Sequence, residues 1–199
     1  MPRTGLSAAE ITEKAIDTTM GKMRQIGFAK VRLTDIAREL GLSHAALYAH
    51  FKDKTALFDA VSERWLLEIE AHLESVCRQP VEPLEKIEAW CLALHRAKVA
   101  KVLHDPELYK AFDLSTAVQK PFAARHMENL HRQLVGLFNE ARAARGLGEG
   151  DAEAMAQVLT EALMAFHHPK LVAQFLQDDR EPLLLRVLDS VLRGLGLKA

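Results

Sequence analysis

Histidine is the residue type in this chain that could do metal or acid–base chemistry, and seven of its nine copies lie after residue 70. A helix that binds a metal through histidine usually places two of them four residues apart on one face. His126 and His131 are five apart, and His167 and His168 are adjacent and point in different directions. The sequence also lacks a nucleophile elbow, a phosphate loop and a zinc-protease motif. We therefore expect no metal, no cofactor and no enzyme activity, with a helical enzyme built on these histidines as the weakest alternative.

Residues 33–51 have the pattern of two short helices joined by a tight turn. Ala37 is small where the two helices must cross, Gly41 permits the positive φ of the turn, and Ser43 can cap the second helix. Leu47 and Phe51 lie four residues apart and face the core. This arrangement is typical of a helix-turn-helix, whose second helix enters the major groove of DNA. An ordinary helical hairpin inside a bundle is the alternative interpretation.

The polar residues of this segment favour the DNA-binding interpretation. His44, Tyr48 and His50 project away from the apolar face, and Lys52 and Lys54 follow directly. The net charge of the chain is only −1, but residues 20–54 carry seven Lys/Arg against three Asp/Glu. A basic N-terminal patch on a mildly acidic body is compatible with one face that touches phosphate.

These residues also give the chain a likeness to a known family. The matching positions are Asp35-Ile36-Ala37, Gly41, Ser43, Leu47-Tyr48, His50-Phe51, Asp53-Lys54 and Leu57. In these positions the chain resembles the tetracycline-repressor (TetR) family of transcriptional regulators, over about a third of its length. The resemblance implies an all-α protein with an N-terminal three-helix helix-turn-helix domain (1–52) and a larger helical domain for effector binding and dimerisation (53–199).

The resemblance also assigns roles on the DNA side. It implies that Tyr48 and His50 bind backbone phosphate, with Lys54 as a further contact. The start of the second helix, from Ser43 through His44, Ala45 and Ala46, would face the DNA, with the last three at base edges, where alanine can contact thymine methyl groups. The family usually has Ser or Thr where this chain has Arg32, so either the first helix of the motif starts later, using Thr34, or Arg32 contacts phosphate directly.

Apolar residues recur at helical spacing along the whole chain, and alternating β-branched runs are absent. No apolar run approaches the ~18 residues of a membrane span, and the N-terminus lacks an apolar signal core, so we expect a cytoplasmic protein. The spacing predicts helices over residues 7–26, 33–40, 44–50, 53–78, 83–103, 106–116, 121–145, 151–167, 169–177 and 182–194.

Two of these predicted helices carry broad apolar stripes that could form a dimer interface. One stripe runs along residues 151–167, and the other includes Leu183, Leu188 and Leu192. Packing inside one protomer is the alternative for both stripes. The family resemblance favours a four-helix interface between two copies, as suits a regulator that reads two half-sites of a pseudo-palindromic double-stranded operator.

The middle helices carry scattered aromatic and imidazole groups that could line an apolar effector pocket. The candidate residues are Trp90, His104, Phe112, His126 and Phe166. Together with the resemblance they predict a repressor that a small apolar or aromatic molecule releases from its operator. A DNA-binding regulator without an effector is the alternative.

Overall fold

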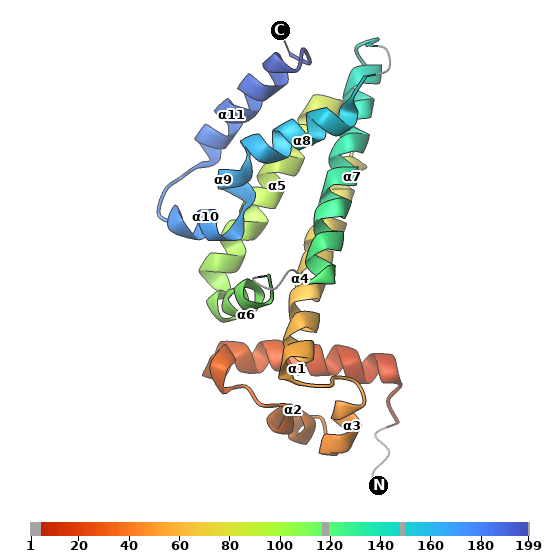
Figure 1. Cartoon of the computed structure of the whole chain (residues 1–199), viewed down its shortest axis with the longest axis vertical. Helices are drawn as coiled ribbons and strands as arrows, with labels where there is room; N and C mark the ends of the chain where they lie inside the picture. Colours follow the sequence, from red (N-terminus) through yellow and green to blue (C-terminus); the bar gives the residue numbers. More distant parts are fainter. Residues whose placement is uncertain (1–4, 117–119, 148–149, 199) are drawn as a thin grey trace. The chain divides into compact units, whose positions relative to one another are not determined.

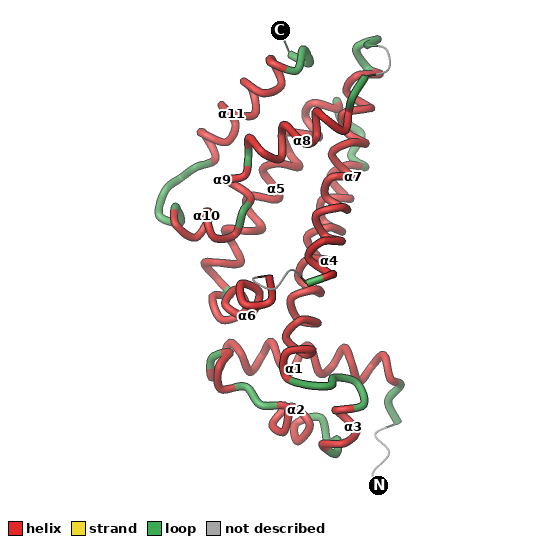
Figure 2. The backbone as a smooth tube through the Cα atoms, viewed as in Figure 1, coloured by secondary structure: helices red, strands yellow, loops and turns green. Residues whose placement is uncertain are grey.

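The computed structural model describes residues 5–116, 120–147 and 150–198. Within these ranges every regular element is a helix, as Figure 2 shows, which confirms the all-α class. The helices are α1 (Ala8–Ile26), the 3₁₀ helix η1 (Phe28–Lys30), α2 (Leu33–Glu39), α3 (His44–Tyr48), α4 (Lys54–Cys77), α5 (Pro83–His104), α6 (Pro106–Thr116), α7 (Pro121–Ala143), α8 (Ala152–Ala162), α9 (Met164–His167), α10 (Pro169–Gln174) and α11 (Glu181–Gly194). Among the described helices, none combines the length and the apolar character needed to cross a membrane.

The chain folds into two compact units. The first contains residues 1–66 and 105–120, and the second contains residues 67–104 and 121–199. This division differs from the boundary at 52/53 that the sequence suggests. The first part of α4 and all of α6 pack with the N-terminal helices, because Leu57, Phe58 and Val61 of α4 and Leu108 and Ala111 of α6 share their buried core.

The first unit is built on α1, with α2 and α3 on one side of it (Figure 1). A capping box starts α1, since Ser7 Oγ accepts from the Glu10 backbone N–H and the Glu10 side chain accepts from Ser7. The helix ends at Gly27, whose φ of 84° only glycine adopts without strain. The centre of the core contains Met23, Ile36 and Leu47, whose side chains are fully buried.

Two carboxylates fasten α6 to the end of α1. The Arg24 guanidinium donates to both oxygens of Asp105, at 2.6 and 2.7 Å. The backbone N–H of Phe28, just after α1, donates to Glu107 Oε2 at 2.7 Å. The lysine after the helix, Lys120, pairs with Asp59 of α4 at 2.7 Å. These bonds hold a segment from the middle of the sequence against the N-terminal helices.

The second unit is a layered helical bundle in which α7 packs on α5 and α8, and α11 packs on α8 and α5 (Figure 1). Its core includes Trp90, Leu134, Phe138, Leu159 and Leu188, all nearly fully buried. The helix predicted over 151–167 is divided at Leu163, whose ψ of 8° lies outside the α-helical range. Pro169 occupies the first position of α10, where a missing N–H costs nothing.

Candidate nucleic-acid interface and effector site

The helix-turn-helix forms as the sequence predicts. α2 ends at Glu39, Gly41 takes a φ of 65°, and the Leu42 N–H donates to the Ala37 carbonyl at 2.9 Å. Ser43 Oγ then accepts from the Ala46 N–H at 3.1 Å and so caps α3. Since Leu47 is fully buried against α2, the opposite side of α3 is left to face outward.

The structure brings the predicted base-reading residues together on that outward side. His44 and Ala45 are exposed and Ala46 is half-buried. Tyr48 is 41% exposed, and its ring lies 4.3 Å from that of His44, one turn earlier on α3. The pair forms a small aromatic surface that runs from the first to the last residue of α3 on the side that a recognition helix turns toward DNA.

The start of α2 decides between the two sequence alternatives for its cap. The helix begins at Leu33, and Arg32 occupies the N-cap position in an extended conformation without a side-chain cap. Thr34 lies in the first turn and is exposed, so a later start capped by Thr34 is wrong. The side chain of Arg32 is exposed, in keeping with the alternative that it faces phosphate.

Two predicted phosphate contacts have partners within the protein. His50 is half-buried, with Nδ1 3.3 Å from Thr12 Oγ1. Lys54 Nζ donates to the Ala29 carbonyl at 3.0 Å and lies 5.9 and 5.0 Å from the ring centroids of Phe28 and Phe58. Burial, and then the charge of Arg32, lower the pKa of Lys54. The ammonium group therefore ties α4 to η1, a role that its position beside the motif does not suggest.

The five predicted effector residues do not form one cluster. Phe112 belongs to the first unit, where its ring meets Trp65 edge-on at 4.8 Å. Trp90, His126 and Phe166 are buried in the second unit, and His104 is exposed there. Residue type, the basis of this prediction, does not determine which helix face meets which neighbour.

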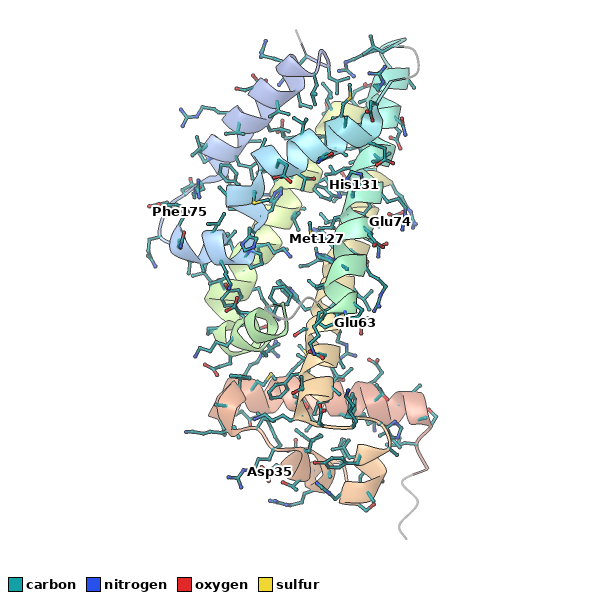
Figure 3. The ribbon with its side chains drawn as sticks, viewed as in Figure 1. Asp35, Glu63, Glu74, Met127, His131 and Phe175 are labelled. Atoms are coloured by element: carbon teal, nitrogen blue, oxygen red, sulfur yellow. The ribbon has the colours of Figure 1, made fainter. Side chains whose placement is uncertain are left out.

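His104 lines a pocket of about 290 Å³ between the end of α5 and the α9–α11 segment. Sequence reasoning missed its main feature, Arg180, whose guanidinium lies 4.5 and 4.2 Å from the rings of Phe166 and Phe175. Phe175 marks the exposed edge of this group in Figure 3. Arg96 donates twice to Glu181, at 2.8 and 2.6 Å, which lowers the pKa of that carboxyl.

A second polar group lies deeper in the second unit, where α4, α5 and α7 meet. The Glu70 carboxylate accepts from His126 Nδ1 and from Asn129 Nδ2, each at 2.7 Å. Lys98 is 5% exposed, and burial lowers its pKa to about 8, with Glu70 opposing the shift. Burial, and then the charge of Lys98, lower the pKa of His126 to about 3, so this imidazole is neutral at physiological pH. Among the described residues, no group of His, Cys, Asp or Glu is arranged to hold a metal ion.

Comparison with known proteins gives the chain its family. Residues 7–61 match the family described as bacterial regulatory proteins, tetR family, and residues 83–188 match the tetracyclin repressor-like C-terminal domain. The chain belongs to the TetR family. The family prediction, and with it the architecture of an N-terminal helix-turn-helix followed by a helical C-terminal domain, is confirmed.

Sequence relatives match the N-terminal part of this TetR-family chain. It is 36% identical over 64 residues to a protein of Escherichia coli K12 named as a probable repressor of the acrEF/envCD operon, and 32% identical over 83 residues to the transcriptional regulator AcrR of Shigella flexneri. These alignments cover 32% and 41% of the chain but only 28% and 39% of the relatives.

Solved structures extend the similarity to nearly the whole chain. SmeT, the repressor of the multidrug efflux pump SmeDEF of Stenotrophomonas maltophilia, matches with a TM-score of 0.62 at 19% identity, over 96% of this chain and 91% of SmeT. Thermus thermophilus FadR, solved in complex with lauroyl-CoA, matches with a TM-score of 0.62 at 18% identity, over 92% and 94% of the two chains. At these identities the likeness shows the fold.

Lys54→Ala is expected to lower the free energy of unfolding by about 1 kcal/mol, because it removes a hydrogen bond and a cation–π contact. Lys52→Ala is the matched control, since Lys52 is exposed two residues earlier and should leave the stability unchanged within about 0.5 kcal/mol. Urea denaturation of both variants measures the difference. Equal stabilities of the two variants would contradict the role given to Lys54.

The low pKa of His126 leads us to expect that mild acid destabilises the protein. Its folded pKa lies below its unfolded value of 6.5, so below pH 6.5 the unfolded chain takes up a proton that the folded chain refuses. Stability is therefore lost as the pH falls, by about 2 kcal/mol between pH 6.5 and 5 from this group. His126→Asn keeps a donor toward Glu70 and cannot titrate. Urea unfolding at the two pH values should show a smaller loss in this variant, and an equal loss would refute the assignment.

Proposed function

We propose that this TetR-family protein is a transcriptional repressor that binds a pseudo-palindromic operator as a homodimer and leaves it when a small molecule binds in the second unit. The observation that carries the proposal is the capped, outward-facing α3 beside the basic N-terminal segment. The names of the sequence relatives, an operon repressor and AcrR, support the same activity. A cytoplasmic location follows from that activity, since the operator lies there.

On DNA, His44, Ala45 and Ala46 would read base edges from the start of α3. Ser43, Tyr48 and His50 would contact the backbone on either side of the groove, with Arg32 and Thr34 at the start of α2. Lys54 remains a predicted phosphate contact, although its ammonium is engaged with Ala29. The exposed Lys52 is better placed to supply a mobile positive charge. Few of these groups are bidentate donors, so phosphate contacts would supply most of the affinity.

The dimer would form through α8 and α11, but not through every residue of the two stripes. Leu188 and Leu192 are 1% and 3% exposed within a single protomer, as are Leu159 and Leu163 at 1% each. These residues pack inside the protomer, as the alternative interpretation holds. Val158, Met164 and Leu183 are instead 47%, 41% and 40% exposed. We assign the interface to these outward apolar side chains, because they offer surface that a second copy can still bury. A lasting dimer needs upward of ~1,200 Å² of such buried surface.

Effector binding would be coupled to DNA binding through the segments that join the units. α4 belongs to both units, and α5 of the second unit leads directly to Asp105, which holds Arg24 of α1. A ligand that favours another tilt of these helices would change the separation of the two recognition helices in the dimer. Half-sites about 34 Å apart tolerate little change in that separation. SmeT has been solved with triclosan and Thermus FadR with lauroyl-CoA, which supports a small molecule as effector.

Two other functions remain to be separated from this one. A regulator without an effector would bind DNA equally in the presence of any small molecule. A helical enzyme would turn over a substrate, and the family to which the chain belongs consists of regulators. Calorimetric titration of a candidate ligand with and without operator DNA decides for or against coupling, which must act equally in both directions.

His44→Ala and Lys52→Ala test the DNA face in different ways. His44→Ala should cost about 1–3 kcal/mol at particular base pairs of a selected operator and relax the preference there. Lys52→Ala should weaken binding to all sequences alike and reduce the slope of log affinity against log salt by about one. Fluorescence anisotropy at several salt concentrations measures both effects. Unchanged affinity in both variants would place the recognition face elsewhere.

The double variant Val158→Glu, Leu183→Glu tests the interface without disturbing the protomer core. It should yield folded monomer, because four carboxylates would then replace apolar side chains at the interface and would have to lose their hydration for the two copies to associate. Met127→Glu is the control, since Met127 is 52% exposed on α7 (Figure 3) and should leave the dimer intact. Light scattering reports the mass and circular dichroism the fold. A dimeric double variant rules out the assignment of α8 and α11.

A further inference from the structure

His50, which follows α3, is held in place by its neighbours. Its backbone N–H donates to the Leu47 carbonyl at 3.0 Å, and the next residue, Phe51, is buried in the core of the first unit. The imidazole is half-buried, and its Nδ1 lies 3.3 Å from Oγ1 of Thr12 on α1. Both residues belong to the first unit, so the contact lies within one compact body.

The hydroxyl of Thr12 decides which of the two groups donates in this contact. A hydroxyl has one proton to give, and Thr12 Oγ1 donates it to the Ala8 carbonyl one turn earlier on α1, at 3.1 Å. Toward His50 the same oxygen can therefore only accept. Nδ1 of His50 carries the proton of this hydrogen bond, so Thr12 selects one of the two neutral tautomers of the ring.

The other ring nitrogen of His50 is left open. Among the residues that the structure describes, none is a hydrogen-bond partner of Nε2, and Nε2 is not one of the buried atoms that lack a partner. In a neutral ring with its proton on Nδ1, this nitrogen carries a lone pair and no proton. A phosphate oxygen also only accepts, so the neutral ring has no hydrogen bond to offer it.

Protonation of the ring removes this conflict. An imidazolium has an N–H on both nitrogens, so Nδ1 can keep its bond to Thr12 while Nε2 donates to phosphate in a charge-assisted bond. A neutral ring with its proton on Nε2 would place two acceptors face to face, unless the Thr12 hydroxyl gave up its bond to Ala8. An imidazole in water takes up its second proton at about pH 6.5, close to physiological pH.

The charged groups nearby do not replace the phosphate. The charged and titratable side chains close to this pair along α1, α3 and the start of α4 are Glu10, Glu13, Lys14, His44, Lys52, Asp53 and Lys54. The three carboxylates are engaged elsewhere: Glu10 in the capping box of α1, Glu13 in an ion pair with α4, and Asp53 as the cap of α4. Within the described ranges, then, no carboxylate is dedicated to a charged His50, whereas a phosphate of DNA would serve as its counter-ion.

We propose that Thr12 is a positioning residue for operator binding, which holds the proton of His50 on Nδ1 so that His50 binds a backbone phosphate only after it takes up a second proton. Each protomer that docks on DNA gains one proton in this way. Affinity is then highest below about pH 6.5 and falls as the pH rises above it, because the bound state carries more protons than the free state. The inference rests on the proposed function for the phosphate contact, but the tautomer can be measured without DNA.

Long-range ¹H–¹⁵N correlation spectra of the wild-type protein at about pH 8, where an imidazole in water is neutral, test the tautomer. We expect the ¹⁵N shift of a protonated nitrogen for Nδ1 of His50 and that of an unprotonated nitrogen for Nε2. The His50→Gln variant identifies the two resonances by their loss. A neutral ring with its proton on Nε2 would overturn the inference.

Fluorescence anisotropy with an operator selected from a random-sequence pool tests the consequence at constant ionic strength. From about pH 6 to about pH 8 the wild type should lose at least about tenfold in affinity. Thr12→Val keeps the shape of the side chain without its oxygen, so the neutral ring is free to carry its proton on Nε2. This variant should bind about three- to tenfold more tightly than the wild type at about pH 8, a gain that damage to the fold would not produce. Thr12→Ser keeps the hydroxyl and should follow the wild type.

His50→Gln completes the series, because its amide can donate near the place of Nε2 but cannot titrate. The pH dependence that remains in this variant comes from other groups, including His44 on the same face. A wild-type profile no steeper than that of His50→Gln would overturn the inference, as would a Thr12→Val profile equal to that of the wild type. Thermal unfolding at both pH values checks that each variant is folded. If Thr12→Val is not, the tautomer and the comparison with His50→Gln decide.

These measurements keep the inference and the proposed function apart. Wild-type protein that binds operator without any pH dependence beyond that of His50→Gln would contradict the proton uptake and leave the repressor function standing. Failure to select any operator would contradict the proposed function, while the expected tautomer would still support the role of Thr12 in the free protein.

Discussion

The continuity of α4 is the constraint on which both compact units depend. Leu57 and Val61 near its start are buried in the core of the first unit, and Ile69 and Leu73 further along are buried in the second. Each residue of an α-helix turns the direction of the side chain by about 100°, so one helical register serves two separate cores. A single inserted residue within α4 would rotate one set of side chains away from its core while leaving the other in place. This explains why the helix carries buried apolar residues along its whole length.

Features that depend on near neighbours in the sequence could be predicted from it. The Ser7–Glu10 capping box, the glycines at 27 and 41 and the cap at Ser43 each need only a few consecutive residues, and together they define the DNA-binding helices. The apolar stripe of α11 was equally visible. Periodicity shows that a helix has an apolar face, but it does not say whether that face meets the same protomer or another copy. The sequence around Leu188 is therefore the same whether this side chain packs inside the protomer or against a second copy.

Features that depend on distant parts of the chain could not be predicted in this way. The attachment of α6 to α1 joins residues that are 81 positions apart, and the contact of Lys54 with Ala29 joins residues 25 apart. The partners of Glu70 come from a helix more than 50 residues later. Nothing local at either end marks such pairs, because ionic and polar side chains on helices are common and most of them face solvent. The effector residues proposed by type alone were scattered for the same reason.

The position of α6 has a consequence for the making of the protein. A ribosome releases the N-terminal helices first, but Leu108 and Ala111, which help to fill their core, emerge only after residues 67–104 of the second unit. The nascent helix-turn-helix is therefore incomplete, with apolar surface uncovered, until residue 120 has left the exit tunnel. The helices of the recognition surface acquire the last part of their core only when the start of the second unit has been synthesised. A chain that ends prematurely before α6 therefore lacks the apolar side chains that complete the core beneath the DNA-binding helices.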